Sequence, residues 1–135
     1  MIEIDDLDAT SVVTRRTEEA IRLLDIVRRE ARQAEILPFV RHMDGTVGEV
    51  ETVLAEVEVR LGETGKLDDR SFSQVYAAGA AHGAMALLCR QFRDDPCEHV
   101  RLACAAGEIA LGRLAISRGQ MQIIDAVKRR LDTTT

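Results

Sequence analysis

Residues 46–61 read TVGEVETVLAEVEVRL, and this stretch decides the fold class. Its apolar side chains recur at alternating steps of three and four residues, at Val47, Val50, Leu54, Val57 and Leu61. Residues three and four apart share one face of an α-helix, so the spacing predicts a helix with one apolar stripe. Such a helix is stable mainly because the stripe is packed, so other helices must cover it.

The same period runs through an earlier segment, at Val13, Thr17, Ala20, Leu24, Val27, Ala31 and Ala34. We expect this helix to span 12–34, after a loose lead-in over 1–10. It should end before Pro38, because the residue that precedes a proline avoids helical backbone angles.

Turn and capping signals divide the rest of the chain. The Asp44-Gly45 pair predicts a turn, and a capping box at Thr46 then predicts a helix over 46–62. A second capping box, at Ser71, predicts a helix over 71–93.

A proline at the first helical position predicts that the last helix begins at Pro96. Isoleucine or leucine recurs every seven residues after it, which favours one continuous helix over 96–131 despite Gly119. A frayed tail over 132–135 should follow, and no segment has the alternation of a strand. We therefore predict an all-α single domain over 1–135, a four-helix up-and-down bundle with a long C-terminal helix.

Composition agrees with a small helical domain. The chain has 135 residues, of which 46% are hydrophobic and only 3% aromatic, so its core must be aliphatic and alanine-rich. The net charge of -5 argues against a nucleic-acid partner. The chain has three cysteines, and an odd, small number does not suit a disulfide framework. Its first residues are acidic, whereas a signal peptide begins with basic residues. We expect a cytoplasmic protein without membrane contact, and the arginine- and alanine-rich composition suggests a bacterial one.

The predicted last helix is longer than its neighbours: at a rise of about 1.5 Å per residue, its length would be about 50 Å. Part of it would overhang the bundle and expose apolar side chains at Met121, Ile123, Ile124, Val127 and Leu131. Exposed apolar patches usually mark an interface, so we predict a homodimer formed through this helix.

Two glycines, Gly79 and Gly83, stand four residues apart in the predicted third helix. Glycine inside a helix costs about 1 kcal/mol relative to alanine, so its use there needs a reason. We favour a tight crossing against the next helix, where Gly107 offers a matching small residue. The alternative is a groove on this face that admits a ligand or a partner helix.

His82, Met85 and Cys89 follow at helical spacing and could place imidazole, thioether and thiol groups together. Soft metal ions such as Cu(I) accept this ligand set, so a metal site is an alternative. None of the established metal-binding spacings is present, however, and the side chains equally suit a core.

Three arginines, Arg15, Arg22 and Arg29, stand seven residues apart on the first predicted helix. They could contact a nucleic-acid backbone, although interleaved acidic residues favour ion pairs within the helix.

No nucleophile or phosphate-binding motif supports catalysis. We therefore predict a non-enzymatic helical interaction module without a cofactor, such as an adaptor, small subunit or inhibitor that docks on a larger protein. A metal or small-molecule sensor and a subunit of a nucleoprotein complex are the alternatives.

Overall fold

The computed structural model describes residues 8–134, with side chains placed for 8–133. This part of the chain is all-helical and contains no strand, as the sequence predicts. Its elements, in order, are α2 (Ala9–Glu30), the short 3₁₀ turn η1 (Gln33–Glu35), α3 (Ile36–Thr64), α4 (Asp69–Gln91), α5 (Glu98–Leu111) and α6 (Arg118–Thr134).

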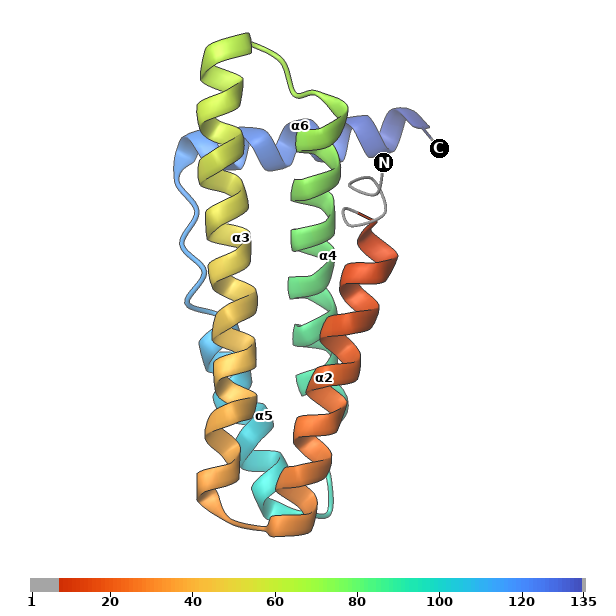
Figure 1. Ribbon diagram of the computed structural model, residues 1–135, viewed down its shortest axis with the longest axis vertical. Coiled ribbons are helices and arrows are strands. Elements are labelled where there is room, and N and C mark those ends of the chain that lie inside the picture. The colour runs from red at the N-terminus through yellow and green to blue at the C-terminus, as the bar shows by residue number, and fades with distance from the viewer. Residues whose placement is uncertain (1–7, 135) are drawn as a thin grey trace.

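The packing of the first four α-helices is consistent with a bundle. Figure 1 shows α2, α3 and α4 running along the long axis of the molecule, with the shorter α5 beside the lower half of α3. Helix α6 runs across the upper part of α3 and α4, almost at right angles to them.

Helix α2 begins and ends earlier than predicted. It begins at Ala9, because the Asp8 side chain accepts a hydrogen bond from the Thr10 amide at 3.3 Å. It ends at Glu30, because Ala31 adopts a left-handed conformation with φ of 49°. The predicted span of 12–34 is therefore wrong at both ends. Of the predicted lead-in, residues 9 and 10 are helical, and residues 1–7 lie outside the described part.

Helix α3 contains Pro38 and the Asp44-Gly45 pair, both of which were predicted to lie between helices. Pro38 lies in its first turn, where no intrahelical donor is needed. The expected turn at Asp44-Gly45 and the helix start at Thr46 are wrong. The Thr46 hydroxyl instead donates to the His42 carbonyl of the preceding turn at 3.0 Å. The penalty of about 1 kcal/mol for one helical glycine is small beside the burial of this helix's apolar face.

The boundaries of the next helices lie within a few residues of their predicted positions. Gly65, with φ of 73°, ends α3 two residues later than expected. Asp68, rather than Ser71, caps α4, and its carboxylate accepts a hydrogen bond from the Ser71 amide at 2.7 Å. Helix α5 begins at Glu98, two residues after Pro96.

The predicted continuous helix over 96–131 is wrong. Helix α5 ends at Leu111, and residues 112–117 lead to the separate helix α6. Ser117 and Gln120 form a reciprocal capping box, with the Gln120 amide 3.1 Å from Ser117 Oγ and the Ser117 amide 3.2 Å from Gln120 Oε1. This box starts a new helix, which extends to Thr134 through most of the predicted frayed tail; Thr135 lies outside the described residues.

The apolar interior has two parts. The first core lies among α2, α3, α4 and α5 and is centred on Phe39, Met43 and Met85. The second core lies where α6 crosses α3 and α4, and α6 contributes Ile123 and Val127 to it. Among residues 8–134, no helix combines the length and the apolar character needed to cross a membrane.

Candidate functional site

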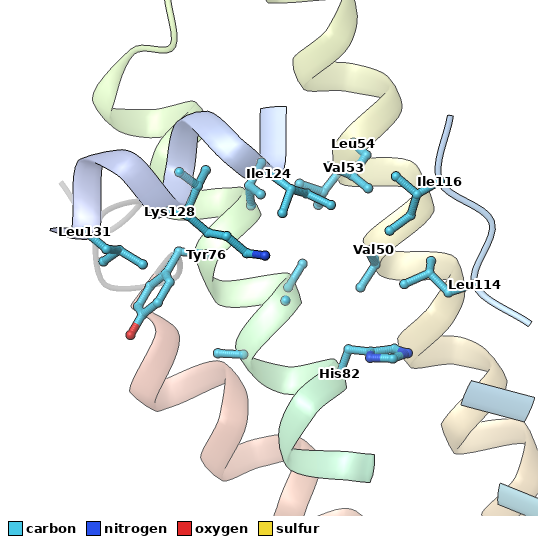
Figure 2. Close-up of a pocket in the computed structure, with 15 residues that line it drawn as sticks. Val50, Val53, Leu54, Tyr76, His82, Leu114, Ile116, Ile124, Lys128 and Leu131 are labelled. Atoms are coloured by element: carbon cyan, nitrogen blue, oxygen red, sulfur yellow. The ribbon is translucent and has the colours of Figure 1, made fainter. Parts of the chain in front are cut away.

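An apolar groove of about 270 Å³ lies where α6 crosses α3 and α4; we call it the α6 groove. Figure 2 shows its walls, which come from α3, α4, α6 and the connection over 112–117. Its lining is almost entirely aliphatic and consists of Val50, Val53, Leu54, Val75, Tyr76, Ala78, Gly79, Ala80, His82, Leu114, Ile116, Ile124, Val127, Lys128 and Leu131.

Polar contacts at both ends of α6 hold it over the groove. Near its start, Gln120 Nε2 donates to Glu58 Oε1 of α3 at 3.3 Å. Near its end, Arg130 pairs with Asp69 of α4, and its guanidinium carbon lies 4.3 Å from the centre of the Phe72 ring. These anchors fix the crossing of α6 and leave a hollow between its two attachment points.

Three side chains with polar groups line the groove: Lys128, His82 and Tyr76. Figure 2 shows Lys128 extending from α6 toward the middle of the groove, whereas the Tyr76 hydroxyl points away from it. The half-buried His82 ring places Nε2 3.0 Å from the Leu111 carbonyl, so this nitrogen carries the proton and donates. Within residues 8–133, Lys128 makes no ion pair.

The three glycines singled out in the sequence have different surroundings. A methyl group added at Gly79 or Gly83 would meet no other atom within 4 Å, so neither lies at a tight helix crossing. Gly79 instead lines the α6 groove, and Gly83 does not. Only Gly107 fits the predicted close packing, because a Cβ there would lie 2.9 Å from the Phe39 ring and 3.0 Å from Cys89 Sγ.

The predicted metal-ligating residues lie in different environments. Met85 and Cys89 are fully buried in the first core, whereas His82 lies at the α6 groove. No group of three or more His, Cys, Asp or Glu residues within the described chain has the geometry of a metal site.

The arginines of α2 take part mainly in contacts within the protein. Arg22 donates to both carboxylate oxygens of Glu19, at 2.8 and 2.6 Å, and Arg29 lies 3.4 Å from the Asp25 carbonyl. Arg15 borders a small hollow and stays exposed. The neighbouring Arg16, which lies outside the seven-residue spacing, reaches across to the His42 carbonyl and the Glu49 carboxylate of α3.

The apolar residues of the predicted dimer interface do not form a free overhang. Ile123 and Val127 are buried in the second core, while Ile124 and Leu131 line the α6 groove. Only Met121 is largely exposed, at 45% of its surface. The physical reason is the break after Leu111, which lets α6 fold back over α3 and α4.

The largest exposed apolar side chains of α5 lie on its outer face instead. Leu102 and Ile109 expose 49% and 63% of their surfaces. They belong to a line that starts with Glu98, passes the exposed Ala105 and ends at Arg113, just beyond the helix; we call it the α5 seam. The steps of four, three and four residues from Glu98 to Ile109 place these residues on one face of α5, a spacing that can be read from the sequence.

No family model matches this chain, and neither a curated protein nor a solved structure matches it. The geometry of the α6 groove and the α5 seam is therefore the basis for inferring function.

Proposed function

We propose that this protein is a non-enzymatic helical interaction module that pairs with a second copy of itself through the α5 seam. The exposure of Leu102 and Ile109 on one face of a helix carries this proposal. Two large aliphatic side chains exposed in this way add nothing to the stability of a monomer in water. Burial of each of them in an interface would contribute about 1.5 kcal/mol or more to the free energy of association.

The order of residues along the seam supports a symmetric partner. In an antiparallel pair of α5 helices centred between Ala105 and Ala106, Leu102 lies opposite Ile109 of the second copy. Just beyond the helix, the same register brings Arg113, which lies 4.0 Å from Asp44 of its own chain, near Glu98 of the second copy. Apolar residues then meet apolar ones and opposite charges meet, as a two-fold interface requires. The alanines at the centre allow the two helices to approach closely.

A shallow hollow beside the seam supports the same pairing. It is lined by Leu37 and Val40 of α3 and by Leu102 and Ala106 of α5, among others. Leu37 is itself 53% exposed, so the apolar surface extends beyond α5. A side chain from the second copy would find aliphatic contacts there on both sides.

In this proposal the α5 seam, rather than the C-terminal helix, forms the dimer interface. The class of function, a non-enzymatic interaction module, is the one predicted from the sequence. A larger protein partner would bind the dimer at surfaces other than the seam. We place the protein in the cytoplasm because its cysteines, Cys89, Cys97 and Cys104, are free thiols, which reducing compartments preserve.

Sedimentation equilibrium over a range of protein concentrations tests the proposal. We expect the wild type to dimerise and Ile109→Asp to raise the dissociation constant by more than about tenfold, since both copies lose an apolar contact. Val59→Asp is the matched control, because Val59 is 62% exposed on α3 and lies outside the seam.

Charge reversal tests the register. Glu98→Arg alone or Arg113→Glu alone should weaken the dimer by a few fold, since exposed pairs contribute up to about 1 kcal/mol each. The double reversal should restore the wild-type dissociation constant. A wild type that stays monomeric at millimolar concentration, or a dimer that Ile109→Asp leaves unchanged, would refute the proposal.

A further inference from the structure

The α6 groove has the character of a small-molecule site rather than of a packing defect. Its volume of about 270 Å³ lies close to the lower end of the range of roughly 300–1,000 Å³ for ligand pockets. Four separate segments form its walls, and α6 is anchored on either side of it by Gln120 and Arg130. A compact aliphatic molecule would contact several of these walls at once.

The charge at the groove narrows the class of ligand. Lys128 is the only lysine or arginine that lines it, and no described acidic residue does so. The Lys128 ammonium has no ion-pair partner within residues 8–133 and extends toward the middle of the groove (Figure 2). A cation beside low-dielectric walls attracts an anion more strongly than a cation in open water does. The groove therefore suits a molecule with an aliphatic body and one negative charge.

We propose that the α6 groove binds a medium-chain aliphatic carboxylate, with the carboxylate at Lys128 and the hydrocarbon chain along Gly79 and the aliphatic walls. The proposal explains why residue 79 is a glycine, because a larger side chain there would occupy the space that the hydrocarbon chain of the ligand needs. The site is independent of the α5 seam, since none of its lining residues belongs to α5.

Isothermal titration calorimetry with sodium decanoate tests this site, with octanoate, decanol and decylamine as comparison ligands. We expect decanoate to bind as one molecule per chain. Octanoate should bind more weakly by roughly fourfold for each methylene lost, the equivalent of about 0.8 kcal/mol. Decylamine should bind more weakly than decanol by a few fold, because its ammonium would meet that of Lys128.

Two pairs of variants locate the site. Gly79→Leu should abolish decanoate binding, whereas Gly83→Leu, also on an open face of α4 but outside the groove lining, should leave it unchanged. Lys128→Met should weaken decanoate binding by about fivefold with little effect on decanol, as expected for one exposed ion pair. Lys66→Met is the control for the loss of a lysine.

Three results would overturn the inference. The first is the absence of decanoate binding to the wild type. The second is equal binding by Gly79→Leu and the wild type. The third is a change of oligomeric state, measured by sedimentation, in Gly79→Leu and not in Gly83→Leu, because the occupant would then be a second copy of the chain. Since no residue of α5 lines the groove, the first two results leave dimerisation through Ile109 untouched, whereas the third would place a contact between copies at the groove.

Discussion

Arg16 and His42 exchange hydrogen bonds across the interface of α2 and α3. Arg16 Nη1 donates to the His42 carbonyl at 3.2 Å, and His42 Nε2 donates to the Arg16 carbonyl at 2.9 Å. Arg16 Nη2 also reaches Glu49 at 3.3 Å. His42 Nδ1, 3.5 Å from Arg16 Nη1, is then an acceptor, so the arrangement favours the neutral imidazole. Burial lowers the pKa of His42, and the nearby Arg16 charge lowers it further, against the opposing effect of the bond to the Arg16 carbonyl.

This pKa direction predicts a loss of stability in mild acid. The unfolded chain binds a proton at His42 near pH 6.5, while the folded chain resists it, so the free energy of unfolding should fall as the pH drops below about 6.5. His42→Gln should reduce that dependence between about pH 7 and 5.5, as measured by urea unfolding at several pH values. His99→Gln is the control for the loss of a histidine, because it leaves the contact between Arg16 and His42 in place. Equal slopes in His42→Gln and the wild type would contradict the prediction.

The contrast among glycines predicts effects of opposite sign. Gly107→Ala should lower the free energy of unfolding by about 1–3 kcal/mol, because the new methyl group would collide with Phe39 and Cys89 in the first core. Gly83→Ala should raise it by about 0.4–1 kcal/mol, because the methyl group meets open space and alanine favours the helix. Thermal and urea unfolding measure both changes, and a stabilised Gly107→Ala would show that this crossing is looser than described.

The position of α6 predicts a strong difference between two of its apolar residues. Ile123→Ala should lower the free energy of unfolding by about 2–5 kcal/mol, since Ile123 is 1% exposed in the second core. Met121→Ala should change it by less than about 1 kcal/mol, because that side chain is largely exposed. Urea unfolding at low protein concentration separates this effect from dimerisation. The reverse order would be expected only if α6 were an interface helix.

The cysteines should differ in their reactivity. A hydrogen bond with Cys104 and burial raise the pKa of the Cys89 thiol, so little reactive thiolate forms there. Cys97 is partly exposed at the start of α5 and should react first with iodoacetamide, while Cys89 and Cys104 should react only after unfolding. Mass spectrometry of peptides from the native and the denatured protein measures the order. Rapid labelling of Cys89 in the native protein would contradict its burial.

Helical periodicity was sufficient to predict the fold class, because the apolar stripe from Val47 to Leu61 is stable only when other helices cover it. The ends of the helices were harder, since local signals compete with burial. The Asp44-Gly45 pair signals a turn in isolation, but Phe39, Met43 and Val47 place one continuous apolar face across it. Tertiary packing kept the helix continuous here, and local sequence signals carry no information about that packing.

The candidate sites were less predictable for the same reason. Leu102, Ile109 and Ile123 belong to one seven-residue repeat, with Ile116 between the last two, yet Leu102 and Ile109 are exposed and Ile123 is buried after the chain turns. Gly79 could be recognised as an unusual residue, but whether a helix or an empty groove faces it depends on where α6 lies. Gly119, together with the capping box of Ser117 and Gln120, was the local signal for that position.

The two cores also differ in which parts of the chain they need. Every buried residue of the first core lies between Ala20 and Leu111, so that core needs no residue of α6. The second core needs Ile123 and Val127, and detachment of α6 would leave Val50, Leu54 and Val57 uncovered. Local opening of α6 alone would therefore keep the first core intact and expose an apolar surface on α3 and α4.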